Sequence, residues 1–208
     1  MVIPMEYTHT GYDYLDRVDS VLPQWHSGVD LNFGRPYEDL GKTVKATASG
    51  VVVFAEDTGK GWGNLVVIYH KKYKVWSRYG HLQNFIVKEG QTVLEGQPIG
   101  GCGGTGGEWA PHLHFDIILE MLTKWTAYTS WWSIDKVRQY YADPLKFIEE
   151  ANKMEAPTPN IVDWHIEHQI IEQWEEVPPE WKSTVAWTIY KMGKSIINGE
   201  LNKDDFYL

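Results

Sequence analysis

The chain has 208 residues, enough for one good-sized domain with an appendage or for two small domains. Its 19 Lys and Arg residues against 28 Asp and Glu residues give a formal net charge of −9, which argues against a polyanionic partner such as nucleic acid. One cysteine, Cys102, excludes an intrachain disulfide and a multi-cysteine metal cluster. We expect most of the 11 Trp and 12 Tyr residues to form the core, although such a surplus also lines grooves that bind sugars or peptides.

The first residues, 1–6, lack the basic patch and apolar run of a signal peptide, and the chain contains no long uninterrupted apolar segment. We therefore expect a protein that does not span a membrane and carries no visible export signal. Cys102 lies in the glycine-rich residues 100–104, where a small side chain is needed, so we expect a structural role and not a nucleophilic one.

The first half of the chain is dominated by strand patterns. Residues 1–25 show no periodicity and predict a loop-rich opening segment. Beyond them, short runs of β-branched and aromatic residues bounded by turn residues predict strands at 29–33, 44–46, 50–55, 64–70, 75–79 and 113–119. Strands spaced this closely, with no helical period between them, predict an antiparallel sheet or sandwich.

Two glycine-containing stretches precede the last of these strands. Residues 90–100 are typical of a turn-rich β-hairpin. The run at 100–107 lacks the Gly-Lys-Ser/Thr ending of a phosphate loop and leads into a strand instead of a helix. We interpret it as a tight turn, or as a place where the backbone passes close to a bound chain.

The sequence pattern changes after residue 119. A short helix is predicted near residues 134–141, and Asp143-Pro144 predicts the start of another because proline suits a helix start. Residues 154–159 have the clearest linker composition. We predict a main domain at 1–150, a linker at 151–159 and a helical extension at 160–208, with helices at 161–176 and 180–197.

The most informative polar residues lie at the start of the last strand. Apolar side chains recur at every second position of residues 113–119, which places His112 and His114 on the opposite face. Burial of polar groups is costly unless they find partners, and a metal ion would be a partner for imidazoles. His26 and Asp30, together with a histidine from this strand, offer two nitrogens and one oxygen. That set suits zinc, whose catalytic sites keep three protein ligands.

The pair at 26 and 30 is not the helical metalloprotease signature. No Glu follows His26, and Gly28 and Gly34 favour a loop or strand. We expect Gly28 to let the backbone turn so that both side chains reach one ion.

Four separated segments, taken in order, resemble the lysostaphin-type zinc endopeptidases that cut bacterial peptidoglycan. They are His26-x3-Asp30, Tyr79-Gly80-His81-Leu82, residues 90–100, and Gly106 followed by Pro111-His112-Leu113-His114-Phe115. The resemblance covers residues 26–119. It implies a compact antiparallel β-sandwich or barrel-like catalytic domain of the duplicated hybrid motif type, with a narrow groove that takes peptidoglycan stem or cross-bridge peptides.

The resemblance also implies site residues. One zinc ion would be held by His26, Asp30 and His114, while His81 and His112 would be unliganded catalytic histidines; which of the two is the general base stays open. Asp116 stands where the family commonly carries Glu, and we expect it to act on the metal ligands indirectly if at all. Glu108 and Trp109 would lie near the groove.

Two functions remain as alternatives: an active zinc endopeptidase, or a noncatalytic relative that binds peptidoglycan or regulates another hydrolase. The presence of all five residues favours the enzyme. Its substrate lies on the cell wall, outside the cytoplasm, so we expect a bacteriolytic phage lysin, a virion-associated enzyme or a trimmed secreted protein. Residues 160–208 would pack on their neighbours or contact cell-wall polymer.

The other histidines have simpler interpretations. We expect His9 and His70 to be exposed loop or strand-end residues. His165 and His168 have the spacing of a solvated helix face.

Overall fold

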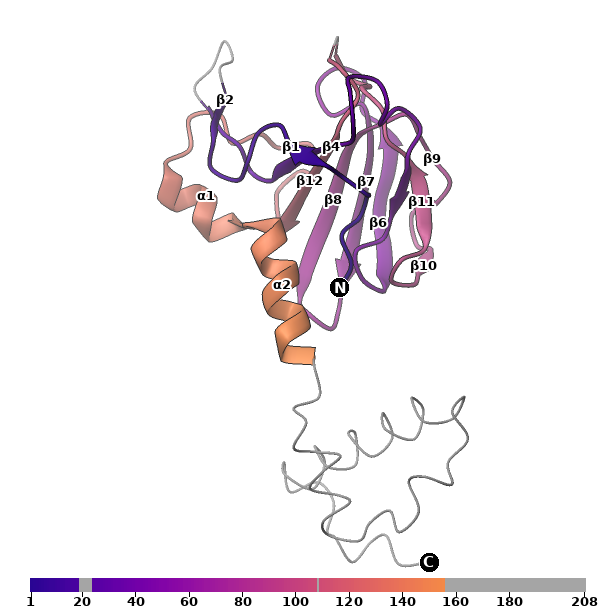
Figure 1. Ribbon diagram of the computed structural model, residues 1–208. Helices are drawn as coiled ribbons and strands as arrows, with labels where there is room; N and C mark the ends of the chain where they lie inside the picture. The colour runs from indigo at the N-terminus through magenta and orange to yellow at the C-terminus, as the bar shows by residue number, and fades with distance from the viewer. Residues whose placement is uncertain (19–23, 108, 156–208) are drawn as a thin grey trace, which may run out of the picture. The chain divides into compact units, whose positions relative to one another are not determined.

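The computed structural model describes residues 1–18, 24–107 and 109–155. Residues Met1–Asn152 form one compact unit built on antiparallel sheets (Figure 1). The largest sheet has eight strands, in the order β1-β4-β12-β8-β7-β6-β10 with β13 paired to β12. Their bounds are β1 His9–Thr10, β4 Val29–Asn32, β6 Gly50–Asp57, β7 Asn64–His70, β8 Val75–Leu82, β10 Thr92–Val93, β12 Leu113–Ile118 and β13 Tyr141–Ala142.

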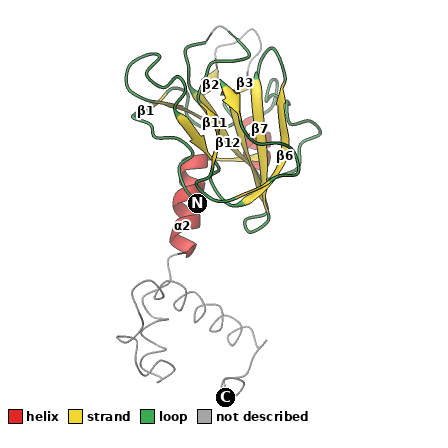
Figure 2. Ribbon diagram, turned by 90° about the vertical axis from the view of Figure 1, so that its right-hand side faces the viewer, coloured by secondary structure: helices red, strands yellow, loops and turns green. Residues whose placement is uncertain are grey.

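Two smaller sheets and two helices complete the described part. One sheet has the order β5-β11-β9, with bounds Thr43–Lys45, Pro98–Gly101 and Asn84–Phe85. The other pairs β2 (Arg17–Val18) with β3 (Gln24–Trp25). The helices α1 (Ile134–Tyr140) and α2 (Pro144–Glu155) follow the last long strand (Figure 2). The prediction of a mainly β, antiparallel domain is therefore confirmed.

The centre of the large sheet is covered on both faces. In β7, five of the seven residues of Asn-Leu-Val-Val-Ile-Tyr-His are buried, as is usual for a strand between two neighbours with both faces covered. All six residues of β12 are buried, including the polar His114 and Asp116. Burial of these polar groups requires partners, and those partners form the site described below.

Two predictions about the sheets were wrong. The opening segment at 1–25 contains β1, β2 and β3, whose two-residue length is too short for a periodic signal. Residues 90–100 do not form a hairpin: β10 pairs with β6, whereas β11 pairs with β5 and β9. The turn between them was recognised, but the strand partners are set by contacts far along the chain.

Both helices predicted between residue 119 and the linker are present. The side chain of Ser133 accepts a hydrogen bond from the backbone nitrogen of Lys136 at the start of α1. At the start of α2, Oδ1 of Asp143 accepts from the nitrogens of Leu145 and Lys146 at 3.1 and 3.2 Å. Helix α2 continues to Glu155, beyond position 151 where the predicted linker begins.

The rest of the predicted linker, the helical extension at 160–208 and its proposed wall contact lie outside the described residues, as do His165 and His168. Within the described residues, no helix has the length and apolar character to cross a membrane.

Gly28 is needed for close packing between β4 and β12. The chain bends at Ser27 and Gly28, as expected, but without a left-handed backbone conformation at the glycine. A Cβ at this position would clash with the carbonyl oxygen of Phe115 and lie 2.6 Å from Cβ of Asp116. The glycine therefore lets the segment before β4 approach the strand that carries His114.

We expect Gly28→Ala to destabilise the fold by about 1–3 kcal/mol, because overpacking forces a backbone shift. Urea unfolding followed by tryptophan fluorescence measures the change. Gly101→Ala is the matched control, since its nearest contact would be Oδ1 of Asn84 at 3.4 Å, an ordinary separation. Equal stability of the two variants would contradict the packing role.

The prediction that His70 is exposed was wrong: its side chain is completely buried. Its Nε2 lies 2.7 Å from Oγ of Ser77, and its Nδ1 lies 3.1 Å from the carbonyl oxygen of Ser49. A carbonyl only accepts hydrogen bonds, so Nδ1 carries the proton. Burial lowers the pKa of His70 below its ordinary value of 6.5 and keeps the ring neutral.

This burial predicts acid destabilisation. Below pH 6.5 His70 is protonated in the unfolded chain, whereas its lowered pKa keeps it neutral in the folded chain. The free energy of unfolding therefore falls as pH falls, by up to about 1.4 kcal/mol per pH unit. Chemical unfolding between pH 7.5 and 5 should show a shallower slope for His70→Gln than for the unmodified protein. The exposed His9→Gln should keep the original slope; an unchanged slope in His70→Gln would contradict the prediction.

Candidate active site

The order of three strands brings the predicted site residues together. Strand β12 lies between β4 and β8, and His114 is directly opposite Asp30 on one side and Gly80 on the other. His26 precedes β4, and His81 follows Gly80 in β8. Positions separated by more than 80 residues in the chain thus share one face of the sheet.

His26, Asp30 and His114 form a tight, buried group of donor atoms. Nε2 of His26 lies 2.9 Å from Nδ1 of His114, and Oδ1 of Asp30 lies 3.1 Å from both nitrogens. Ligand atoms of one tetrahedral zinc ion are about 3.3 Å apart when each bond is near 2.0 Å. The three atoms therefore have nearly the separations that one such ion requires.

The contacts of the outer nitrogens of the two rings favour a cation between the inner nitrogens. Nδ1 of His26 lies 3.1 Å from the carbonyl oxygen of Asp13, which can only accept, so this nitrogen donates. Nε2 of His114 donates in the same way to Oδ2 of Asp116 at 3.1 Å. In its neutral form each ring then turns an unprotonated nitrogen toward the carboxylate of Asp30. Three lone pairs that face one another repel unless a positive charge lies between them, so the group fits a metal ion.

Electrostatics favour a charged carboxylate at this point. Burial alone would raise the pKa of Asp30, but hydrogen bonds with His114 and His26 outweigh it and hold that pKa well below its usual value. Burial would likewise lower the pKa of His114, but its hydrogen bonds to Asp116 and Asp30 raise it. The group thus attracts positive charge, whether a proton or a metal ion.

His81 owes its position to an irregularity in β8. Asn64 is opposite Leu82 and Val66 is opposite Tyr79, so Gly80 and His81 together face one residue of β7. Such a β-bulge re-aims a side chain, and His81 adopts the left-handed value φ 61°, which is uncommon for a residue other than glycine. The strand pattern alone would not have placed this ring in the site.

His81 and His112 lie beside the donor group without joining it. Their ring centroids are 4.8 Å apart, and Nε2 of His112 is 4.0 Å from Oδ1 of Asp30. Nδ1 of His81 lies 3.1 Å from the carbonyl oxygen of Thr105, and Nδ1 of His112 lies 2.9 Å from that of Ala110. Both rings therefore donate through Nδ1, and in its neutral form each has an unprotonated Nε2 that can accept a proton.

The pKa of His81 supports this protonation state. Burial, and the repulsion that His112 and His114 exert when they are protonated, lower the pKa of His81 to about 3. At neutral pH the ring is therefore a neutral acceptor.

Arg78 is the residue that sequence interpretation missed. It is completely buried in β8, and its NH2 lies 2.5 Å from Oδ2 of Asp116, the carboxylate that accepts from His114. The indirect role expected for Asp116 agrees with this contact. A charged residue inside a predicted strand, between Ser77 and Tyr79, was the available signal, because buried charges need partners.

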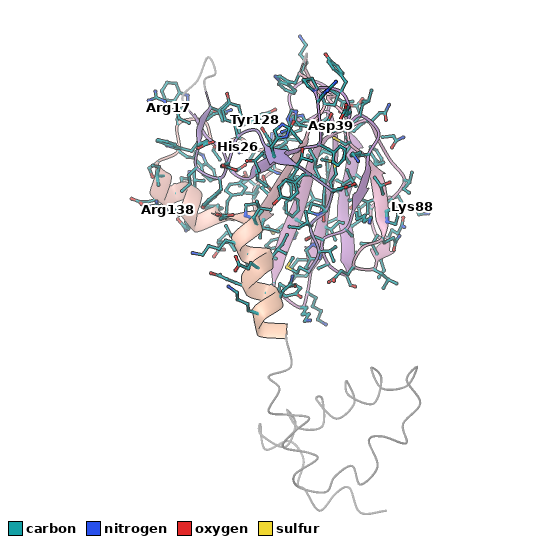
Figure 3. All side chains as sticks on the ribbon, viewed as in Figure 1. Arg17, His26, Asp39, Lys88, Tyr128 and Arg138 are labelled. Atoms are coloured by element: carbon teal, nitrogen blue, oxygen red, sulfur yellow. The ribbon has the colours of Figure 1, made fainter. Side chains whose placement is uncertain are left out.

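A groove of about 340 Å³ opens above the donor group. His26 and Tyr128, both labelled in Figure 3, are among its lining residues. Aromatic side chains contribute much of its wall: Tyr12, Trp25, Trp62, Trp109 and Tyr128. Trp109 thus lies at the groove as expected, whereas Glu108 lies outside the described residues.

Buried metal-ligand atoms at the floor of an open groove, with uncoordinated imidazoles at hand to move protons, are typical of a metallohydrolase. Residues 24–124 match the sequence profile of peptidase family M23. The chain belongs to this family, of the lysostaphin type, as its relatives and structural neighbours also indicate.

Two relatives and one solved structure illustrate the similarity. The chain is 32% identical to lysostaphin of Staphylococcus simulans over 157 residues, 72% of this chain and 28% of that protein. It is 40% identical over 94 residues to the peptidoglycan DD-endopeptidase ShyA of Vibrio cholerae, covering 45% and 20% of the two chains. The structure of the lysostaphin catalytic domain from Staphylococcus simulans matches with a TM-score of 0.54 and 29% identity over 68% of this chain and 92% of that one. The chain therefore spans about a quarter of the length of these curated relatives.

Proposed function

We propose that this protein is a zinc endopeptidase that hydrolyses peptide bonds in the stems or cross-bridges of bacterial peptidoglycan. The observation that carries the proposal is the group of three buried donor atoms, 2.9–3.1 Å apart, beside two imidazoles that each donate through Nδ1 to a backbone carbonyl. The printed names of the relatives, lysostaphin and a peptidoglycan DD-endopeptidase, support the substrate class.

In this proposal His26, Asp30 and His114 hold one zinc ion. When bound, zinc supplies Lewis acidity, polarising a carbonyl group and making a water molecule more acidic. Nε2 of His81 or His112 accepts the proton of the attacking water, and the protonated ring then donates to the leaving amine. The other ring stabilises the oxygen of the attacked carbonyl only in its doubly protonated form, in which Nδ1 keeps its backbone carbonyl and Nε2 donates to the oxygen as negative charge develops there.

The groove orients the substrate. Its aromatic walls, such as Trp62 and Tyr128, offer flat apolar faces to a peptide. Hydrogen bonds from Nδ1 of His81 and His112 to backbone carbonyls fix both rings before substrate binds, which reduces the entropy lost on reaching the reactive geometry.

The alternative is a noncatalytic relative that uses the same groove to bind wall peptides or to regulate another hydrolase. Incubation of the zinc-loaded protein with purified peptidoglycan, followed by mass spectrometry of the soluble products, separates the two functions. The enzyme releases new amino termini at one type of peptide bond and lowers the turbidity of the wall suspension. Binding to the walls without new amino termini would overturn the proposal and favour the alternative.

The substrate determines where the protein acts. We propose action on the cell wall from outside the cytoplasm, as a phage lysin, a virion-associated enzyme or a secreted protein. Mass spectrometry of fragments released from several wall types would identify the bond and the susceptible bacteria.

A further inference from the structure

We propose that Arg78 is a positioning residue that links the metal-ligand group to one wall of the groove. The inference rests on the proposed function for its catalytic consequence, although the contacts themselves are independent of it. Arg78 is completely buried, and its guanidinium contacts three separate parts of the domain: the Asp116 carboxylate, the loop at 125–127 and the ring of Trp62.

The first contact acts on the metal ligands. Nε of Arg78 lies 3.2 and 3.1 Å from the two oxygens of Asp116, and NH2 lies 2.5 Å from Oδ2. Asp116 in turn accepts from Nε2 of His114 at 3.1 Å and from the hydroxyl of Ser27, next to His26, at 3.0 Å. One bidentate ion pair therefore fixes the carboxylate that sets the ring orientation of His114.

The second contact acts on the groove. NH1 of Arg78 donates to the carbonyl oxygen of Trp125 at 2.7 Å and approaches that of Ala127 at 3.3 Å. These carbonyls immediately precede Tyr128 and Thr129, which line the groove. The planar fork of five N–H groups lets one arginine hold a carboxylate and two carbonyls together, whereas a lysine ammonium has three donors at one point.

Trp62 contacts both the metal-ligand group and the groove wall. The guanidinium carbon of Arg78 lies 3.9 Å from the Trp62 ring centroid, and Nε1 of Trp62 donates to the carbonyl oxygen of Thr126 at 3.0 Å. The same ring stacks on Tyr128 with centroids 5.3 Å apart and meets His114 edge-on at 4.8 Å. A displacement of Arg78 would thus reach both the metal ligand and the groove wall.

The experiment uses zinc affinity and local hydrogen exchange, neither of which needs activity. Arg78→Lys keeps the charge beside Asp116 but loses the fork, so we expect amide exchange in residues 125–129 to rise about tenfold and zinc affinity to fall by up to about tenfold. Asp116→Asn should weaken zinc binding by about 10–100-fold and raise exchange in 125–129 by less than Arg78→Lys does, because NH1 of Arg78 keeps its two carbonyl acceptors. Arg138→Lys, at an exposed arginine with side-chain exposure of 61%, is the matched control and should change neither.

A steady-state measurement adds the catalytic consequence. With a soluble cross-linked peptidoglycan fragment as substrate, Arg78→Lys should raise KM at saturating zinc, because the wall around Tyr128 is displaced. If the unmodified protein hydrolyses no such fragment, the proposed function fails, but the zinc and exchange measurements still test the positioning role.

Unmodified protein provides a measurement that no folding defect can obscure. Zinc should slow exchange in residues 125–129 by threefold or more, because a fixed His114 ring fixes Asp116 and, through it, Arg78. Absence of this slowing would overturn the proposal. So would an Arg78→Lys variant that melts at a lower temperature but keeps the original zinc affinity, KM and exchange in 125–129.

Discussion

Replacement of His114 by alanine is expected to abolish stoichiometric zinc binding and to lower kcat/KM by about a thousandfold or more, because the ion supplies several kcal/mol of transition-state stabilisation. His114 contributes one of three donor atoms and is also the one whose ring is fixed by the Asp116 carboxylate. The remaining His26 and Asp30 do not complete a three-ligand site. Elemental analysis of the purified variant and hydrolysis of peptidoglycan fragments measure the two effects.

The matched control for this variant is His9→Ala, which removes an exposed histidine from the short strand β1. It should retain one zinc ion per chain and the original activity. Near-ultraviolet circular dichroism of both variants reports whether the fold is kept. A folded His114→Ala protein that still binds one zinc ion tightly, or that still cleaves at the original rate, would refute the role of His114 as a ligand.

The second large effect concerns the histidines outside the donor group. We expect His112→Ala to keep one zinc ion per chain while kcat falls by about 100–10,000-fold, the usual contribution of general acid–base catalysis. We expect zinc to be retained because His112 is not part of the donor group: its Nε2 lies 4.0 Å from Oδ1 of Asp30. Loss of zinc together with activity would instead assign His112 a ligand role.

The same experiment applied to His81 distinguishes the roles of the two rings. The pH dependence of kcat/KM loses its acid limb only in the variant that lacks the general base. His81→Gly is preferable to His81→Ala here, because φ at this position is 61° and glycine adopts that value without strain. An unchanged acid limb in both variants would exclude both rings as the base.

The positions of the long strands were predictable because their signals are local. Val29–Asn32, Asn64–His70 and Leu113–Ile118 follow β-branched or alternating patterns that need no knowledge of the rest of the chain. The two-residue strands β1, β2 and β3 were missed because two residues carry no period. His70 was misassigned because its position at a strand end gives no sign of what packs over it.

The sequence by itself determined which side chains offer chemistry: histidines and an aspartate in separated segments whose order and spacing match a known family. Only the tertiary structure decided how they meet. Pairing of β12 with both β4 and β8 brings His114 opposite Asp30, a bulge turns His81 inward, and Arg78 finds its carboxylate in a neighbouring strand. These features depend on which distant segments lie side by side, and strand pairing is a non-local property that residue patterns along one strand do not encode.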